Sequence, residues 1–280
     1  MPRILPWLVV LLLAAAATPQ QSKPGPLKPP EPPKVMRVPR TPAPEPPPIP
    51  AEEIIRRFAE KETALRDQQQ EFSFRVSLRV QEFDEADQPA GVYELVGRLL
   101  VNERGERSIR LDAEPKSTLQ RATLSLEDVQ ELLTLPLFPL PAGEIEHYEI
   151  TYLGQRPLDE LTTFSFRVQP KQLSRQRRFF DGVVWVDDRD FAIVRWHGEY
   201  VAEAEDPGRP ALFRRFEVYR ENVGETLWFP TFVRSEEWLK SEAGEARLRL
   251  TVRYTDYTPL PEPLREAVRQ ARPAAVRPQS

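Results

Sequence analysis

The chain has 280 residues, with 39 lysines and arginines against 43 aspartates and glutamates, and a formal net charge of −4 at pH 7. This mildly acidic balance argues against a general nucleic-acid binder, whose surface is basic. Cysteine is absent, which excludes disulfides, thiolate metal ligands, a thiol nucleophile and a lipid-attachment cysteine.

Residues 1–18 have the pattern of a secretory signal peptide. Arg3 precedes an apolar run from Leu8 to Ala17 that ends in small residues, as in a cleavable leader. The run is shorter than the ~20 residues that cross a bilayer, and an uncleaved anchor helix is the alternative. We therefore expect export, and the lack of cysteine suits a bacterial periplasm.

Residues 19–50 are predicted to form a proline-rich, disordered linker. Fourteen of these residues are proline, so the segment can neither pack a core nor form a helix or a central strand. A semi-rigid polyproline spacer is expected. The spacer could be a plain solvated linker, hold the next domain away from a membrane, cross a peptidoglycan layer, or offer a docking motif.

Residues 51–259 are expected to form the folded domain, since about 210 residues suit one all-β or α+β domain with a substantial core. The pattern predicts an amphipathic helix from Ala51 to Gln70, with carboxylates in its first turn. A shorter helix is predicted from Ser125 to Leu135 because its start has a capping pattern. The apolar, proline-containing segment Pro136–Gly143 is expected to be a loop that either acts as a lid or simply packs.

Elsewhere in this domain, alternation of apolar and polar residues predicts antiparallel strands. The expected strands are Phe72–Gln81, Val92–Val101, a short one around Ile109 and Leu111, Tyr148–Tyr152, Phe164–Val168, a hairpin over Phe179–Val201, Phe213–Arg220, Leu227–Arg234 and Ala246–Tyr257. A meander of about nine or ten strands is long enough to curl strongly. Residues 260–280 are predicted to be a basic, disordered tail.

The hairpin over Phe179–Val201 is the stretch around which the domain is organised. Two runs of β-branched and aromatic residues flank four polar residues. Pairing of Val186 with Phe191 would place Trp185 opposite Ala192 and make both faces apolar near the turn. We expect one face to meet the core or a helix and the other to line something that also excludes water.

Residues suited to catalysis are few. The two histidines, His147 and His197, are expected at strand ends or in cross-strand pairs. The sequence contains no G-x-S-x-G, H-E-x-x-H, P-loop or G-x-G-x-x-G string. Asp187, Asp188 and Asp190 could hold Ca²⁺ or form a solvated turn. A further group of cations could attract anionic lipid head groups or an acidic partner, or belong to an ordinary soluble loop. It consists of Lys171, Arg175, Arg177 and Arg178.

Three segments resemble the LolA-like superfamily of outer-membrane lipoprotein-sorting proteins, especially a branch found in acidobacterial genomes. They are the G-x-V-W-V-D string at 182–187 with the apolar residues after it, Phe216–Asn222, and Leu227–Trp238. The resemblance covers about 51–259. It implies an α+β, mainly antiparallel fold, a curled incomplete β-barrel capped by helices, whose concave apolar face holds acyl chains in the periplasm. It brings no catalytic residues.

These observations predict a periplasmic, non-enzymatic binding or carrier protein for lipoprotein acyl chains or other lipids, without cofactor or metal. Burial of apolar surface at ~25 cal/mol/Å² makes an acyl chain a sufficient ligand. The alternative is an envelope signalling or scaffold module that binds a membrane-protein partner. The candidate cavity residues are Phe74, Val76, Val183, Trp185, Leu250 and Val252.

Overall fold

The computed structural model describes residues 45–134, 137–204, 211–224, 226–241 and 244–271. These residues belong to one compact unit, Ala43–Ser280. The expected signal peptide and nearly all of the expected linker lie outside the described residues. Within the described part, no helix has the length and apolar character needed to cross a membrane.

The helix predicted after the linker is α1 (Ala51–Gln69). At its start the Pro50 carbonyl accepts a hydrogen bond from the Glu53 N–H at 3.0 Å, and the Glu53 carboxylate lies in the first turn, where the helix dipole favours it. The apolar side of α1 is buried, and the rings of Phe58 and Phe166 lie 5.6 Å apart. The helix therefore packs on the sheet along the side that the sequence predicts.

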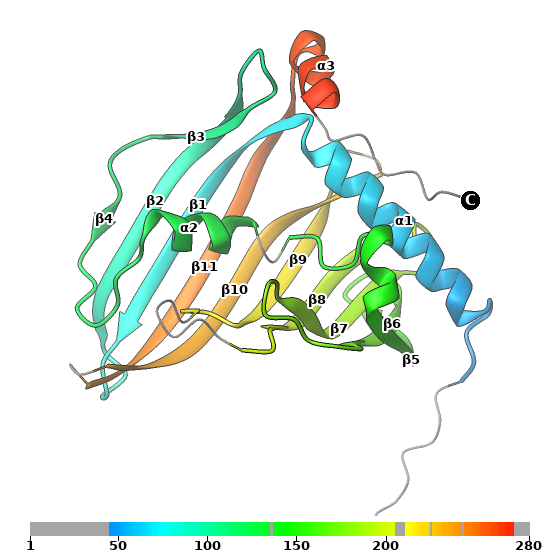
Figure 1. Ribbon diagram of the computed structural model, residues 1–280, viewed down its shortest axis with the longest axis horizontal. Helices are drawn as coiled ribbons and strands as arrows, with labels where there is room; N and C mark the ends of the chain where they lie inside the picture. The colour runs from blue at the N-terminus through cyan, green and yellow to red at the C-terminus, as the bar shows by residue number, and fades with distance from the viewer. Residues whose placement is uncertain (1–44, 135–136, 205–210, 225, 242–243, 272–280) are drawn as a thin grey trace, which may run out of the picture. The chain divides into compact units, whose positions relative to one another are not determined.

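All strands join one antiparallel sheet in the order β3-β2-β1-β11-β10-β9-β8-β7-β6-β5, with β4 paired to β2 (Figure 1). Their bounds are β1 (Phe72–Phe83), β2 (Pro89–Val101), β3 (Arg107–Leu111), β4 (Lys116–Ser117), β5 (Tyr148–Leu158), β6 (Leu161–Pro170), β7 (Phe179–Asp187), β8 (Ile193–Val201), β9 (Arg215–Val223), β10 (Leu227–Ser241) and β11 (Gly244–Pro259). The first and last long strands are neighbours. After β4 the chain crosses to the far edge of the sheet at β5, and each following strand from β6 to β11 then lies next to the one before it, until β11 pairs with β1.

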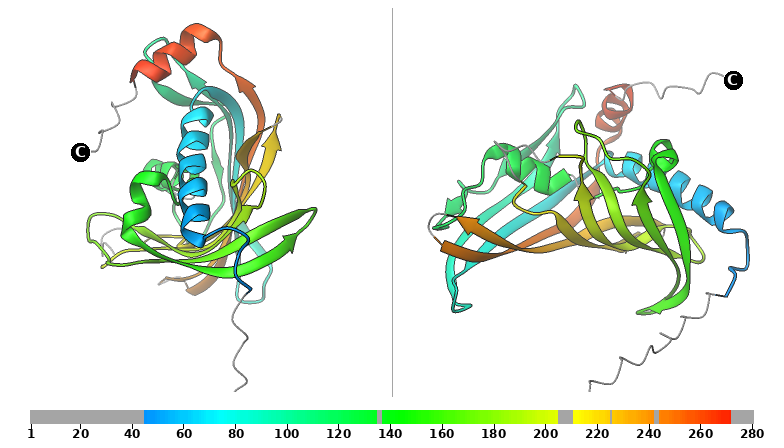
Figure 2. Two further views of the ribbon diagram at one scale, coloured as in Figure 1. Left: turned by 90° about the vertical axis from the view of Figure 1, so that its right-hand side faces the viewer. Right: turned by 60° about the horizontal axis from the view of Figure 1, so that its bottom comes forward.

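The sheet curls around α1 and a second helix, α2 (Leu126–Thr134), which lie on its concave side (Figures 1 and 2). A short 3₁₀ helix, η1 (Ala142–His147), leads into β5. Among the described strands β3 and β5 end the sheet and do not pair with each other, so the barrel is incomplete. The predicted fold class, mainly antiparallel with capping helices, is confirmed.

The core lies between the helices and the concave face of the sheet. On β1 and β11, Leu78 pairs with Val252 and Val80 with Leu250, and all four side chains are fully buried. Polar residues alternate with them along both strands, as expected for a sheet with one face on a core.

The β7–β8 hairpin forms in a different register from the predicted one. Val186 pairs with Ile193 instead of Phe191, and a bulge separates this pair from Trp185 and Arg195. Phe191 has a φ of 55°, a left-handed conformation that does not continue a strand. The turn is therefore longer than the four polar residues, and β8 is shifted along β7 relative to the predicted pairing.

The side chain of Asp187 explains why this turn is long. Its carboxylate accepts hydrogen bonds from the backbone N–H groups of Arg189 (3.1 Å) and Asp190 (2.8 Å), which stabilises a compact local turn. In the resulting register Val183 lies opposite His197. The expectation that both faces near the turn are apolar is wrong, since polar partners face Trp185 and Val183.

The expected disordered tail contains a helix, α3 (Glu262–Ala271). The Pro261 carbonyl accepts hydrogen bonds from the N–H groups of Leu264 and Arg265, so the prolines stand at the helix start, where they are tolerated. Val268 is buried in a small apolar cluster at this end of the domain. Disorder was thus wrongly predicted for α3, and residues 272–280 lie outside the described part.

Candidate binding site

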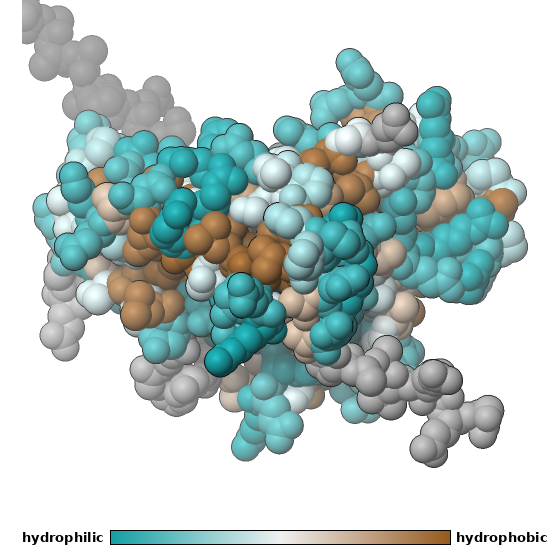
Figure 3. Space-filling view, turned by 90° about the horizontal axis from the view of Figure 1, so that it is seen from above, coloured by the Kyte–Doolittle hydropathy of each residue, from teal (hydrophilic) through white to brown (hydrophobic). Residues whose placement is uncertain are grey.

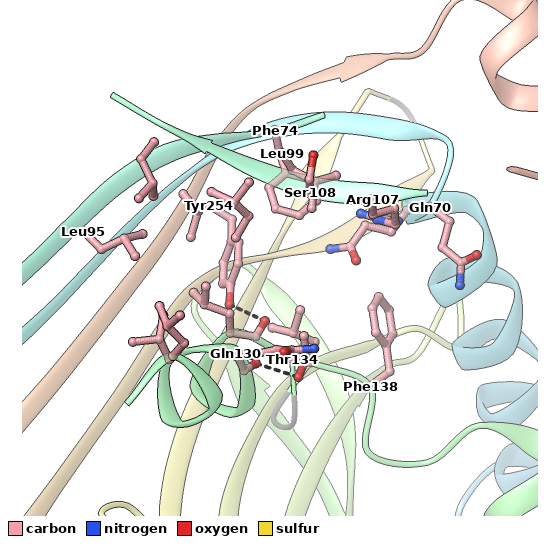
Figure 4. A pocket seen from close by; sticks show the side chains of 18 of the residues that line it. Gln70, Phe74, Leu95, Leu99, Arg107, Ser108, Gln130, Thr134, Phe138 and Tyr254 are labelled. Carbon is pink, nitrogen blue, oxygen red and sulfur yellow. Dashed lines mark hydrogen bonds between the residues drawn. The ribbon is translucent and has the colours of Figure 1, made fainter. Parts of the chain in front are cut away.

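A cavity of about 820 Å³ lies between α2 and the concave face of the sheet at β1, β2 and β3 (Figure 4). Its sheet wall consists of inward-facing residues at alternate positions of the strands, Phe74 and Val76 on β1 and Leu95 and Leu99 on β2. Tyr254 on β11 completes this wall, with its ring 5.7 Å from that of Phe74. The walls are therefore largely aliphatic and aromatic.

Helix α2 forms the opposite wall through Val129 and Leu133. Its start is the predicted capping pattern, because Ser125 Oγ accepts from the Asp128 N–H at 3.1 Å and Asp128 Oδ2 accepts from the Ser125 N–H at 2.8 Å. The Tyr254 hydroxyl donates to the Leu133 carbonyl at 3.0 Å (Figure 4). Burial raises the pKa of the Tyr254 phenol, which keeps it a neutral donor.

A buried carboxylate fastens the loop before α2 to the sheet. Glu82 Oε2 on β1 accepts hydrogen bonds from the backbone N–H groups of Gln120 (2.8 Å) and Arg121 (3.1 Å), and the Arg121 guanidinium pairs with Glu82 Oε1 at 3.1 Å. These bonds satisfy a carboxylate that is fully buried. The cavity wall is thus held in place on the N-terminal side of α2.

An ion pair holds the segment after α2. Arg220 on β9 donates to the Leu137 carbonyl at 2.8 Å and to both carboxylate oxygens of Glu62 on α1, at 2.7 and 2.9 Å. Both side chains are 0% exposed. Burial raises the pKa of Glu62, and the adjacent Arg220 charge opposes the rise. One side chain therefore joins β9, α1 and the loop that follows the cavity wall.

Polar and apolar lining residues occupy different parts of the cavity. Gln70 and Arg107 lie together near the end of α1, whereas Leu95 lies at the other side (Figure 4). At the rim, Leu126 is 80% exposed and Leu111 is 40% exposed. From above, hydrophobic residues show between hydrophilic ones at the surface (Figure 3). The cavity is amphipathic and has an apolar rim.

Four of the six candidate cavity residues lie on the concave side. Phe74 and Val76 line the cavity. Leu250 and Val252 share that face of the sheet but are buried in the core. They support the sheet beside the cavity.

Val183 and Trp185 lie on the opposite side of the sheet from the cavity. Their neighbour Val184 is fully buried against the core, so alternation turns both away from it. Trp185 lies beneath the Arg195 guanidinium, 5.0 Å from the ring centroid. The prediction that they line the cavity is wrong, because Val184 and Val186 take the core-facing positions of β7 and the sequence does not show which face of the strand is concave.

The lining residues on β2 and α2 were not among the predicted cavity residues. The alternation along β2 and the apolar side of α2 were both visible in the sequence. Nothing in the sequence indicated that these two surfaces face each other, because the contact depends on β2 lying next to β1 and on the path of the chain from β4 to α2.

The two histidines lie outside the cavity lining. His147 ends η1, with Nε2 3.8 Å from the Glu146 carboxylate, and His197 is exposed on β8. The residues that the structure describes contain no group of three or more histidine, aspartate or glutamate side chains placed to hold a metal. The pocket offers apolar surface and hydrogen-bonding groups, which suit binding.

The two charged clusters noted in the sequence take part in contacts within the protein. Besides the turn bonds of Asp187, Asp190 accepts from Trp228 Nε1 at 2.8 Å and Asp188 accepts from Gln155 at 3.2 Å. The basic loop is tied to neighbouring acidic residues and carbonyls. Its contacts are Lys171 with the Glu146 carbonyl, Arg175 with Glu203, Arg177 with Glu144 and Arg178 with Glu131 of α2.

The fold and site together define an open antiparallel half-barrel with a helix-covered, amphipathic cavity. No family model and no curated protein sequence matches the chain. Solved structures do match. A LolA superfamily protein from Nitrosomonas europaea is 14% identical, with 73% of this chain and 94% of that chain covered and a TM-score of 0.33.

Two further solved structures match with similarly low sequence identities and TM-scores. A domain described as an outer membrane lipoprotein-sorting protein from Vibrio parahaemolyticus is 13% identical over 73% of this chain and 95% of that chain, with a TM-score of 0.31. The MucA/MucB complex from Pseudomonas aeruginosa matches at 11% identity over 72% and 99%, with a TM-score of 0.24. With TM-scores this low, the likenesses are too weak to bear on the function of the chain.

Proposed function

We propose that this protein is a non-enzymatic carrier of the cell envelope that holds an acyl chain, of a lipoprotein or another lipid, in the cavity between α2 and β1–β3. The observation that supports this most is the cavity itself, about 820 Å³ with aliphatic and aromatic walls. Small-molecule sites have volumes of roughly 300–1,000 Å³. An acyl chain gains binding energy at about 25 cal/mol for each Å² of apolar surface buried, without specific polar partners.

Partly filling the cavity should weaken binding. Leu99→Trp adds a large ring to the sheet wall from a partly buried position, and we expect it to reduce uptake of a fluorescent fatty acid at least about tenfold, a loss of ~1.4 kcal/mol. Leu100→Trp is the matched control, since the neighbouring residue of β2 faces the other side of the sheet.

The measurement is fluorescence titration of both variants and the wild type, combined with mass spectrometry of lipid extracted from the purified proteins. Equal uptake by wild type and Leu99→Trp would show that the fatty acid binds elsewhere. No uptake by the wild type, with no co-purified lipid, would overturn the proposed function.

A second candidate, an envelope module that binds a membrane-protein partner, is favoured by strand β5. In the described part of the chain this eleven-residue strand pairs only with β6, on one side. A free edge of this length can accept an extended peptide segment as an additional strand. A photo-crosslinking residue at Glu149, an exposed position on β5, should then capture a membrane protein in cells, whereas the same residue at exposed Glu94 of β2 should not.

A further inference from the structure

The charges that line the cavity are all of one sign. Among the described lining residues the charged side chains are Arg66 and Arg107, and no aspartate or glutamate is present. This differs from the chain as a whole, which has a net charge of −4. The cavity is thus a cationic site in an acidic protein.

The two arginines belong to the polar end of the cavity. Arg66 and Gln70 are four residues apart at the end of α1, which places them on one side of the helix. Arg107 opens β3 and lies beside Gln70 (Figure 4). The end of α1 and the start of β3 therefore contribute two guanidinium groups and amide donors to the lining of one cavity.

Arg107 marks the boundary between the polar and apolar parts. Its guanidinium carbon lies 5.9 Å from the centroid of the Phe74 ring, which belongs to the sheet wall. Arg66 lies 3.5 Å from Asp67, with 43% of its side chain exposed, and such an exposed pair is weak enough to yield to a bound anion. A head group at this end would remain in contact with an apolar wall.

We infer that the ligand is an amphiphile with an anionic head group, seated by Arg66 and Arg107, whose acyl chain runs between β2 and α2 toward the rim at Leu111 and Leu126. This inference rests on the proposed function and adds the charge and direction of the ligand. Guanidinium groups form strong charge-assisted hydrogen bonds with carboxylate and phosphate oxygens. The C-terminus of α1 carries about half a negative charge, which opposes an anion but is smaller than the charge of a single guanidinium group.

Amphiphiles with one chain and different head groups test this directly. Dodecanoate, dodecyl phosphate, dodecanol and dodecyltrimethylammonium would compete with a fluorescent fatty acid on the purified protein, below their micelle concentrations. We expect the two anions to bind about tenfold or more tighter than dodecanol, and the cation to bind weakest. The preference between carboxylate and phosphate identifies a free fatty acid or a phospholipid as the source of the head group.

The variant Arg66→Gln/Arg107→Gln should lose the preference for anions, so that it binds dodecanoate no better than it binds dodecanol. Arg79→Gln is the control, because Arg79 is an exposed residue on the other face of β1, 3.4 Å from Glu94. Dodecanol binding as tight as dodecanoate binding would overturn the inference and leave the proposed function standing. Failure of every amphiphile to bind would overturn the proposed function.

Discussion

At the scale of single residues, the buried pair of Glu62 and Arg220 connects the fold to the site. Both side chains are fully buried, and Arg220 also binds the Leu137 carbonyl. Because transferring two charges from water into the protein interior is costly, a buried ion pair contributes little net free energy to stability. Losing one partner is strongly destabilising, since it leaves an isolated buried charge. The pair therefore makes the position of the loop after α2 depend on α1.

Glu62→Gln should lower the free energy of unfolding by about 3–5 kcal/mol, because the Arg220 guanidinium remains buried without a counter-charge. Urea unfolding measures this. Glu60→Gln is the control, since Glu60 is exposed and pairs with Arg56 at 2.7 Å, and it should change stability by less than about 0.5 kcal/mol.

The double variant Glu62→Leu/Arg220→Met separates the two effects. It removes both charges together, so it should be more stable than Glu62→Gln. Two outcomes would contradict this explanation. One is a Glu62→Gln variant as stable as the wild type, and the other is a double variant that is the least stable of the three proteins.

At the scale of elements, Glu217 on β9 joins three neighbouring strands on the face away from the core. Its carboxylate accepts from the Tyr219 hydroxyl at 2.6 Å and pairs with Arg195 of β8 and Arg234 of β10. Burial by itself would raise the pKa of Glu217, but the hydrogen bonds from Tyr219 and the two arginines outweigh it and lower the pKa below its usual 4.5.

A lowered pKa in the folded state gives stability that is present above the unfolded pKa, near 4.5, and is lost as the pH falls through the folded value. Acidification from about pH 5 to about pH 3 should therefore cost the wild type more stability than Glu217→Gln, which has no carboxylate to protonate. Urea midpoints across this range measure the difference. Glu221→Gln, at an exposed position on the same strand, should follow the wild type, and parallel curves for the wild type and Glu217→Gln would refute the prediction.

Elements predicted from local patterns are largely present. The helix over α1 and the capping pattern of α2 depend on residues within one or two turns, so the sequence shows them. The hairpin register failed because the Asp187 side chain and the left-handed Phe191 lengthen the turn. The helix α3 was missed because its prolines and arginines were interpreted as a solvated tail, although Val268 is buried in a small cluster.

At the scale of the molecule, the topology builds the site. Because β1 lies beside β11, Val76 pairs with Tyr254 across the sheet, and residues from both ends of the domain line one cavity. The chain then crosses the concave face as α2 and η1 before it reaches β5 (Figure 1). An open sheet with this connection leaves its concave face covered by a short helix, and the cavity lies between the two.

The sequence by itself determined the period of each strand, the start of α1 and α2, and the apolar character of Phe74 and Val76, because these follow from steric and hydrogen-bonding preferences over a few residues. Only the tertiary structure decided that Val183 and Trp185 face away from the cavity and that Arg66 of α1 and Arg107 of β3 line the same cavity. Strand register and the approach of α1 to β3 are set by contacts between distant segments. Such contacts form where packing of the whole domain is most favourable, and no short pattern encodes that choice.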